Sequence, residues 1–276
     1  MYELLAVDLD GTLVRRRGGI APQDKRAIAS LQARGVPVAI ATGRLYSGTV
    51  AVLEELALQG PQVCVNGAEI VMHPGGAEPI YQGLAAHGSA AVRTALGRYD
   101  FAVFTLAQGH VAFDQRGAIF EGYVTGWSHQ LERVDQVLDH PCWETPSGPL
   151  GVVAIGLTEP IAAATAELRQ CQALDVFRFD VSEHVGVSCI LLHAAGVSKG
   201  TGLQTLVEHH GVTLAQTVVV GDWHNDLSMF AVAGRSFAMA GGPERVVQAA
   251  TDRLTATAEA GGGVAEAIAL AWPQRF

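Results

Sequence analysis

Short, continuous apolar runs alternate with longer amphipathic stretches towards both ends of this chain. The runs lie at residues 4–7, 36–41, 62–65, 217–220 and 236–239. Uninterrupted apolar runs of this length predict strands that are buried on both faces of a parallel sheet. Helices are predicted between them, at residues 22–34, 47–58, 198–210, 226–234 and 243–250. This alternation predicts an α/β fold with a doubly wound parallel sheet and right-handed crossovers.

The pattern changes in the middle of the chain. Residues 68–82 predict a hairpin whose turn is His73-Pro74-Gly75-Gly76. The stretch 83–192 mixes short strands with helices; strands are expected at 152–157, 174–179 and 187–192, and a helix at 160–171. We therefore expect an α/β domain at 83–192 that is inserted into a core formed by residues 1–82 and 193–276.

Composition and charge narrow the function. Of the 276 residues, 49% are apolar and 16% are charged, which is typical of a compact globular protein. The formal charge of −9 argues against a nucleic-acid-binding surface, which needs a basic face. A small anionic substrate remains compatible, because a bound metal can outweigh the net charge. No segment resembles a signal peptide or a membrane span, and the four cysteines lack metal-clip spacing. We expect a cytoplasmic protein with reduced thiols that is a monomer or a small homo-oligomer and has no membrane or nucleic-acid partner.

Polar side chains follow several of the predicted core strands at the point where each strand ends. They are Asp8 and Asp10, then Thr42, then Asn66, then Asp222, Asn225 and Asp226. In open α/β sheets, ligands bind outside the carboxyl ends of the strands. The pattern therefore predicts that four strand ends converge on one site.

The string Asp8-Leu9-Asp10-Gly11-Thr12-Leu13 places two carboxylates two residues apart after a buried strand. One carboxylate can attack an electrophile and form a covalent intermediate, and the other can act as general acid and then general base. Gly11 allows a sharp turn and a close approach to a ligand. The structural alternative is an Asp-Gly turn in which Asp10 accepts backbone amides.

Asp222 and Asp226 are four residues apart at a predicted helix start, so both can face one site. Mg²⁺ is usually held by one or two carboxylates together with water and substrate phosphate. The structural alternative is that one of these residues caps the following helix.

Thr42 and Lys199 offer groups that bind phosphate. Thr42 carries a hydroxyl at a strand end beside Gly43, and Lys199 begins a helix whose dipole favours anions. Taken singly, a turn threonine and a solvated surface lysine are the commoner explanations of these two residues.

Together these strings resemble the haloacid dehalogenase-like hydrolases. Residues 8–13 look like motif I, Ile40 to Arg44 like motif II, Gly196 to Gly200 like motif III, and Gly221 to Met229 like motif IV. Asn66-Gly67-Ala68 matches the asparagine–glycine turn of the Cof-type subfamily IIB. The resemblance extends over nearly the whole chain. It implies a Rossmann-like core with an inserted α/β cap of the C2B type at 83–192.

The resemblance also implies roles. Asp8 would be the nucleophile, which carries an aspartyl-phosphate, and Asp10 the acid/base residue. Thr42 and Lys199 would hold the phosphate. Asp8, Asp10, Asp222 and Asp226 would form the Mg²⁺ site, with Asp226 in a supporting place. The residues expected to line the substrate are Leu9, Gly11, Gly43, Arg44, Asn66 and Asn225.

Two features depart from the family pattern or lie near the site without an assigned role. Trp223 and His224 stand between the motif IV aspartates, where many relatives carry small or acidic residues, and they could alter substrate fit. The run Arg15 to Arg17 could attract a phosphorylated substrate, although a solvated loop is the commoner explanation.

The expected activity is Mg²⁺-dependent hydrolysis of a small phosphorylated metabolite, such as a sugar phosphate. A phosphomutase of the phosphomannomutase type on the same scaffold is an alternative, and it would release an isomer instead of free phosphate. A non-catalytic phosphate-binding protein is a second alternative, which the presence of both Asp8 and Asp10 disfavours.

Overall fold

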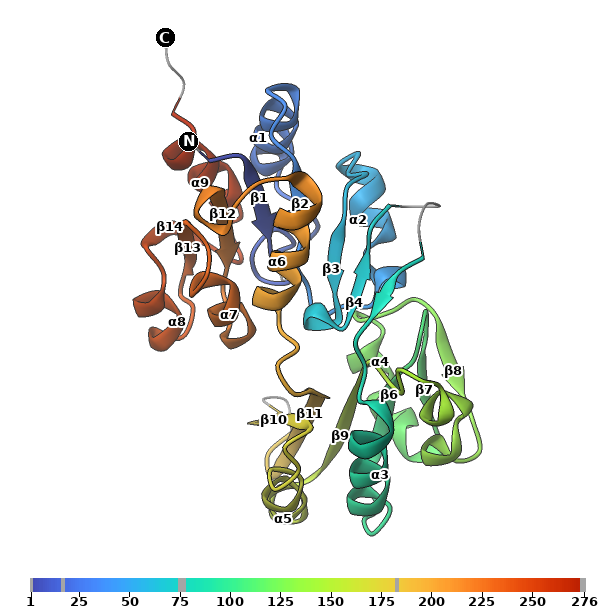
Figure 1. Cartoon of the computed structure of the whole chain (residues 1–276). Coiled ribbons are helices and arrows are strands. Elements are labelled where there is room, and N and C mark those ends of the chain that lie inside the picture. The colour runs from blue at the N-terminus through green and yellow to red at the C-terminus, as the bar shows by residue number, and fades with distance from the viewer. Residues whose placement is uncertain (1, 16–17, 74–77, 182–183, 274–276) are drawn as a thin grey trace. The chain divides into compact units, whose positions relative to one another are not determined.

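A computed structural model of the chain describes residues 2–15, 18–73, 78–181 and 184–273 (Figure 1). Two compact units can be distinguished. Unit 1 contains residues 1–43, 50–79 and 198–276, and unit 2 contains residues 44–49 and 80–197. The stretch 83–192, which is the expected insertion, lies in unit 2, together with 44–49, 80–82 and 193–197. No helix in the described part of the chain is long and apolar enough to cross a membrane.

Unit 1 contains a five-stranded sheet in which every pair of neighbouring strands is parallel. Its strand order is β14 (Asp252–Thr257), β13 (Arg235–Ala240), β12 (Thr217–Gly221), β1 (Leu4–Val7) and β2 (Val38–Ile40). The central strands β1 and β12 are buried along their whole length, as a strand covered on both faces must be. The predicted doubly wound α/β fold is confirmed.

Helices connect and cover these strands. In the described part of unit 1 they include α1 (Pro22–Ala33), α2 (Val50–Glu55), α6 (Lys199–His210), α7 (Leu227–Phe230), α8 (Glu244–Ala249) and α9 (Gly263–Ala271). Helix α6 has the clearest sequence signals. Ser198 and Thr201 form a capping box at its start, and Gly211 ends it in the left-handed conformation. This capped helix places Lys199 in the first turn.

Two expected elements differ from the structure. Residues 62–65 were expected to continue the parallel sheet, but β3 (Gln62–Cys64) pairs antiparallel with β4 (Glu69–Val71). An isolated parallel bridge from Ala41 to Val63 and a hydrogen bond from Ile40 N–H to Gln62 Oε1 connect it with the end of β2. The helix expected at 47–58 is split into a 3-10 turn (Tyr46–Gly48) and the short helix α2. Of the predicted hairpin turn, Pro74, Gly75 and Gly76 lie outside the described residues.

Unit 2 is an α/β domain with its own six-stranded sheet. The strand order is β10 (Leu174–Asp180), β11 (Val187–Ala194), β9 (Gly151–Leu157), β6 (Ala102–Leu106), β7 (Val111–Phe113) and β8 (Leu131–Arg133). The pairs are antiparallel except for β7 with β8. The unit also contains β5 (Ile80–Tyr81), α3 (Ala85–Leu96), α4 (Glu121–Val124) and α5 (Thr158–Leu168). One hydrophobic cluster includes Val92, Ile161 and Leu192, so the sheet and two helices share a core.

A buried histidine makes the stability of unit 2 depend on pH. Burial lowers the pKa of His193 to about 4, although a hydrogen bond with the backbone of Leu150 opposes the shift. The folded state therefore holds His193 neutral while the unfolded chain takes up a proton near pH 6.5. We expect stability to be full above pH 6.5 and to fall between pH 6.5 and pH 4, by up to about 3 kcal/mol from this residue.

Thermal unfolding of the wild type and His193→Gln across that pH range measures this effect. The variant should lose less stability on acidification, whereas His87→Gln, at an exposed position of α3, should follow the wild type. Parallel curves for wild type and His193→Gln would contradict the assignment.

Candidate active site

Three carboxylates and one ammonium meet at the carboxyl ends of β1 and β12. One oxygen each from Asp8, Asp222 and Asp226 lies within 4.8 Å of the others. Lys199 Nζ donates to Asp8 Oδ1 at 2.5 Å and to Asp226 Oδ1 at 2.7 Å. All four side chains are buried, and Lys199 is fully enclosed. The arrangement joins residues from three distant parts of the chain in one polar cluster.

The parallel register explains why these residues meet. Val7 pairs with Val220, so Asp8 and Gly221 leave the sheet side by side, and Asp222 follows. The turn after β1 brings Gly11 against Asp222, where an added Cβ would lie only 2.3 Å from Oδ2. Gly11 also has a φ of +90°, which a side chain would oppose. A glycine is therefore required here by both space and backbone conformation.

Asp226 organises the motif IV loop. Its Oδ2 accepts the backbone N–H groups of Asp222 at 2.8 Å and Trp223 at 2.9 Å, while Oδ1 accepts Lys199. Both carboxylate oxygens are thus engaged within the protein. This geometry fixes the direction in which Asp222 leaves β12.

Thr12 is part of the cluster although no role was predicted for it. Its buried hydroxyl donates to Asp222 Oδ1 at 3.2 Å, across 210 residues of sequence. Its place in the Asp-Gly-Thr string was the only available signal. The bond orients the Asp222 carboxylate from the motif I side.

Charge in the cluster is unbalanced. Burial raises the pKa of Asp8, and Asp226 and Asp222 add to that shift, while the Lys199 ammonium opposes it. Burial also disfavours the charge on Lys199, but attraction to Asp226 and Asp8 raises its pKa overall. Lys199 therefore remains an ammonium at neutral pH. When all three carboxylates are ionised, the cluster has an excess of two negative charges.

That excess fits a divalent cation. The donors are carboxylate oxygens, which hard cations such as Mg²⁺ prefer, and they lie within chelating reach of one another. Asp8 and Asp222 are the better ligands, since the oxygens of Asp226 already accept hydrogen bonds. The residues present therefore suit the cation that the sequence predicts.

A second group of predicted residues lines the end of β2 and the turn after β3. Asn66 N–H donates to the Thr42 carbonyl oxygen at 2.9 Å, and Asn225 Nδ2 donates to Asn66 Oδ1 at 2.9 Å. Ala41 N–H donates to Val7 O, so buried Thr42 leaves the sheet next to the strand that carries Asp8. This turn connects motif II with motif IV.

The backbone of the same turn is strained. Val65, Asn66 and Gly67 have φ angles of 47°, 53° and 105°. A β-branched residue such as Val65 is rarely found in the left-handed region, and such strain persists where the surroundings enforce it. Gly67 approaches α6 so closely that a Cβ would lie 2.3 Å from the Ser198 carbonyl oxygen. The conformation of this turn was not predictable from the sequence pattern.

The remaining residues that were predicted for the site lie in different surroundings. Asp10 is exposed and follows the cluster residue Asp8 by two positions. The Leu9 side chain is fully buried, so only its main chain could meet a substrate. Gly43 lies next to the Asn66 amide. Arg44 belongs to unit 2, where its guanidinium donates to the Gly48 carbonyl oxygen at 3.1 Å. The structure groups the other predicted residues in unit 1.

The arginine run is described only in part. Arg15 is half-buried, and its Nε donates to the Gly19 carbonyl oxygen at 3.2 Å. Arg16 and Arg17 lie outside the described residues. Arg15 thus has a local role in its own loop.

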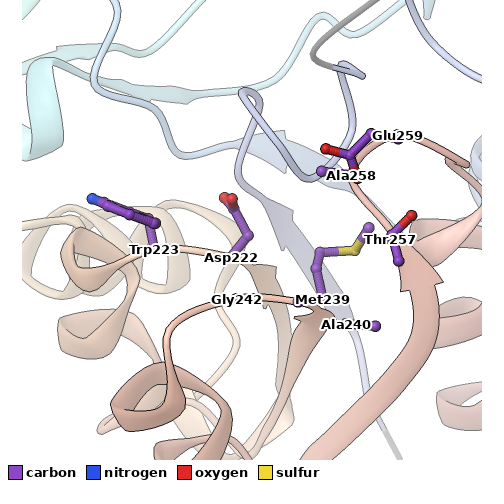
Figure 2. Close-up of a pocket in the computed structure, with 9 residues that line it drawn as sticks. Asp222, Trp223, Met239, Ala240, Gly242, Thr257, Ala258 and Glu259 are labelled. Carbon is purple, nitrogen blue, oxygen red and sulfur yellow. The ribbon is translucent and has the colours of Figure 1, made fainter. Parts of the chain in front are cut away.

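A small pocket lies beside the aspartate cluster (Figure 2). Its volume is about 110 Å³, and its lining includes Asp222, Trp223, Met239, Gly242 and Glu259. Trp223 is half exposed, and its ring lies edge-on to that of His224 at 5.4 Å. An exposed aromatic side chain directly after a cluster aspartate can contact the organic part of a substrate.

Comparison with known proteins agrees with this geometry. A sequence profile described as haloacid dehalogenase-like hydrolase matches residues 5–89 and 167–268, which is more than half of the chain. The chain belongs to the haloacid dehalogenase-like hydrolases. Within that family it is a phosphohydrolase.

Similar proteins include several phosphatases. A phosphoglycolate phosphatase of Natronomonas pharaonis is 30% identical over 240 residues, which cover 87% of this chain and 85% of the relative. A 5-amino-6-(5-phospho-D-ribitylamino)uracil phosphatase of Bacillus subtilis is 26% identical over 278 residues, or 94% of each chain. A haloacid dehalogenase-like hydrolase structure from Bacteroides thetaiotaomicron matches with a TM-score of 0.79 at 24% identity, covering 97% of this chain and 98% of that chain.

Proposed function

We propose that this phosphohydrolase is a Mg²⁺-dependent phosphatase that cleaves small phosphate monoesters through an aspartyl-phosphate on Asp8. The observation that carries the proposal is the buried cluster of Asp8, Asp222, Asp226 and Lys199, whose excess of two negative charges, when all three carboxylates are ionised, suits a divalent cation. Phosphoryl transfer needs mainly in-line positioning and neutralisation of charge. The cluster contains a candidate nucleophile, Asp8, together with groups that can position a phosphate and neutralise its charge.

In the first step, an Asp8 oxygen attacks phosphorus and the bond from phosphorus to the ester oxygen breaks. Asp10 gives its proton to the leaving oxygen. In the second step, Asp10 takes a proton from a water molecule, which attacks the aspartyl-phosphate and releases inorganic phosphate. Bound Mg²⁺ would neutralise phosphate charge. Lys199 holds Asp8 in place and adds positive charge, and Thr42 is the expected hydroxyl donor to the phosphate.

A panel assay tests the activity. Phosphate release would be measured with and without Mg²⁺ on sugar phosphates, phosphoglycolate, 5-amino-6-(5-phospho-D-ribitylamino)uracil and a small aryl phosphate. The named relatives motivate two of these substrates. We expect Mg²⁺-dependent release from at least one ester. The appearance of an isomeric phosphate ester without free phosphate would replace the proposal with a mutase.

Asp222→Asn should raise the Mg²⁺ concentration needed for half-maximal activity by at least roughly 10-fold, because it removes a charged ligand. A Mg²⁺ titration of the steady-state rate measures this change. Glu259→Gln is the matched control, since Glu259 lines the same pocket but lies outside the carboxylate cluster. If both variants titrate like the wild type, the cation binds elsewhere.

Trp223→Ala should change which esters are preferred more than it changes the rate of phosphoryl transfer itself. We expect kcat/KM to fall several-fold for the preferred ester and to remain nearly unchanged for the smallest ester in the panel, because only the larger leaving group can reach the ring. Measurement of kcat/KM over the panel tests this expectation. Equal losses on all esters would indicate that Trp223 positions the motif IV loop instead.

A further inference from the structure

Two histidines and one glutamate converge in unit 2, apart from the catalytic cluster of unit 1. Glu132 Oε2 lies 2.8 Å from His110 Nε2 and 3.2 Å from His140 Nε2. One donor atom from each residue lies within 4.8 Å of the other two. The two imidazole rings are 5.4 Å apart and steeply inclined, at 68°. We infer that His110, Glu132 and His140 form a second metal site, which binds Zn²⁺ or a similar transition-metal cation.

The sheet of unit 2 brings the three residues together. His110 directly precedes β7, which lies beside β8 in the sheet (Figure 1). The two strands pair in parallel, so that Ala112 lies beside Glu132. Side chains two residues apart on a strand share a face, so His110, Ala112 and Glu132 project to the same side. His140 comes from the segment between two 3-10 turns, Val137–Asp139 and Pro141–Glu144, and is nearly buried. The donors are thus held by elements with their own core contacts.

The contact between His110 and Glu132 is short, but it is not a hydrogen bond. His110 Nε2 is buried and has no hydrogen-bond partner with acceptable geometry, although Oε2 is only 2.8 Å away. The in-plane direction of Nε2 therefore does not point along the line to the carboxylate oxygen. A cation chelated by both atoms lies off that line, so this geometry suits coordination better than a direct bond.

The donor set indicates the kind of cation. Two imidazole nitrogens with one carboxylate are typical of zinc sites that keep a further position for water. Tetrahedral ligands around Zn²⁺ at 2.0–2.2 Å are roughly 3.3 Å apart, which matches the 3.2 Å between Glu132 and His140, whereas the 2.8 Å between Glu132 and His110 would have to lengthen slightly. Mg²⁺, which prefers oxygen ligands, should compete poorly. The site therefore differs in chemistry from the carboxylate cluster around Asp8.

Binding requires His140 to give up two hydrogen bonds. Its Nδ1 accepts the Cys142 backbone N–H at 3.2 Å, which leaves the proton of the neutral ring on Nε2, where it donates to Glu132 Oε2 at 3.2 Å. When Nε2 binds a cation, that proton moves to Nδ1 and the Cys142 amide loses its acceptor. Zinc and these two hydrogen bonds are thus mutually exclusive. Zinc binding should alter the amide signals of residues 140–142.

Metal content and the absorption spectrum of Co²⁺ test the site on the full chain. Zn²⁺ would be titrated against a chromophoric chelator in excess Mg²⁺, and Co²⁺ would report ligand geometry through its d–d absorption. Wild type should bind one equivalent more than Glu132→Gln or His110→Gln. Glu132 is half exposed and its replacement is isosteric, so that variant should fold. His87→Gln, at an exposed helix position, should keep wild-type binding.

A third variant distinguishes metal binding at His110, Glu132 and His140 from metal binding at the carboxylate cluster of unit 1. Asp222→Asn should retain the Co²⁺ spectrum and the additional zinc equivalent even when phosphatase activity is lost, so the outcome does not depend on the proposed activity. If Glu132→Gln and His110→Gln bind as much zinc as the wild type, or if Co²⁺ gives no spectrum that depends on them, the three residues form only a polar cluster and the inference is wrong.

Discussion

Asp8→Asn is expected to abolish phosphate release while leaving the protein folded. The substitution removes the nucleophilic oxygen charge but keeps the shape of the side chain, and Lys199 retains Asp226 as a partner. Loss of a covalent nucleophile lowers kcat by factors on the order of 10⁴ or more. Because burial raises the pKa of Asp8, removal of this carboxylate should leave the melting temperature unchanged or raise it.

Two measurements test this prediction. Steady-state phosphate release compares the variant with the wild type, and thermal unfolding confirms that both are folded. Asp10→Asn serves as a companion, because that variant should still form the aspartyl-phosphate when the leaving group needs little protonation, such as an aryl alcohol. Substantial turnover by Asp8→Asn on any ester would exclude Asp8 as the nucleophile.

The core sheet and most of its site could be predicted because parallel strands carry strong local signals. Each buried strand is an uninterrupted apolar run, and its polar residues begin where the sheet ends, so one rule places Asp8, Thr42 and Asp222 at the same edge. The Ser198 capping box and Gly211 likewise fix α6 from local chemistry. The motifs and the hydrophobic periodicity predict the same arrangement of strands, helices and site residues in this part of the chain.

The asparagine–glycine turn after β3 was predicted, but its backbone conformation was not, because that conformation depends on partners far away in sequence. Val65 has no preference for the left-handed region, yet Asn66 is held by Thr42 and Asn225, and Gly67 packs on Ser198. The position of Arg44 in unit 2 likewise depends on a partner that is far away in sequence. The segment after motif II joins unit 2 because Leu45 N–H donates to the Trp127 carbonyl oxygen at 2.9 Å, a pairing that no local pattern encodes.

Only some of the strands of unit 2 could be predicted from the sequence, for a related reason. The apolar runs that become β9 and β11 were evident, whereas β8 is a three-residue edge strand with the sequence Leu-Glu-Arg and no apolar pattern. It exists because β7 offers it a partner. Short edge strands are defined by pairing and not by their own composition. The same pairing brings Glu132 beside His110, which sequence spacing did not suggest.

Lys199→Met should cost both activity and about 3–5 kcal/mol of stability, since it leaves the buried carboxylates of Asp8 and Asp226 without their cation. The methionine fills a similar volume, so lost packing should contribute little. Denaturant unfolding in the absence of Mg²⁺ measures the loss. Addition of Mg²⁺ should restore part of the stability, because a divalent cation can compensate the same carboxylates.

A double-mutant cycle with Asp226→Asn identifies the cause of that loss. If uncompensated charge destabilises Lys199→Met, then Asp226→Asn should rescue it in part, and the two changes together should cost clearly less than the sum of the single losses. The asparagine can still accept the Asp222 and Trp223 amides through its Oδ1, so the motif IV loop remains held. Additivity within about 0.5 kcal/mol would show that Lys199 and Asp226 are not energetically coupled, and uncompensated charge on Asp226 would then not explain the loss. Rescue of stability without rescue of activity separates the two roles, because phosphate release needs the ammonium itself while folding needs only a balanced charge.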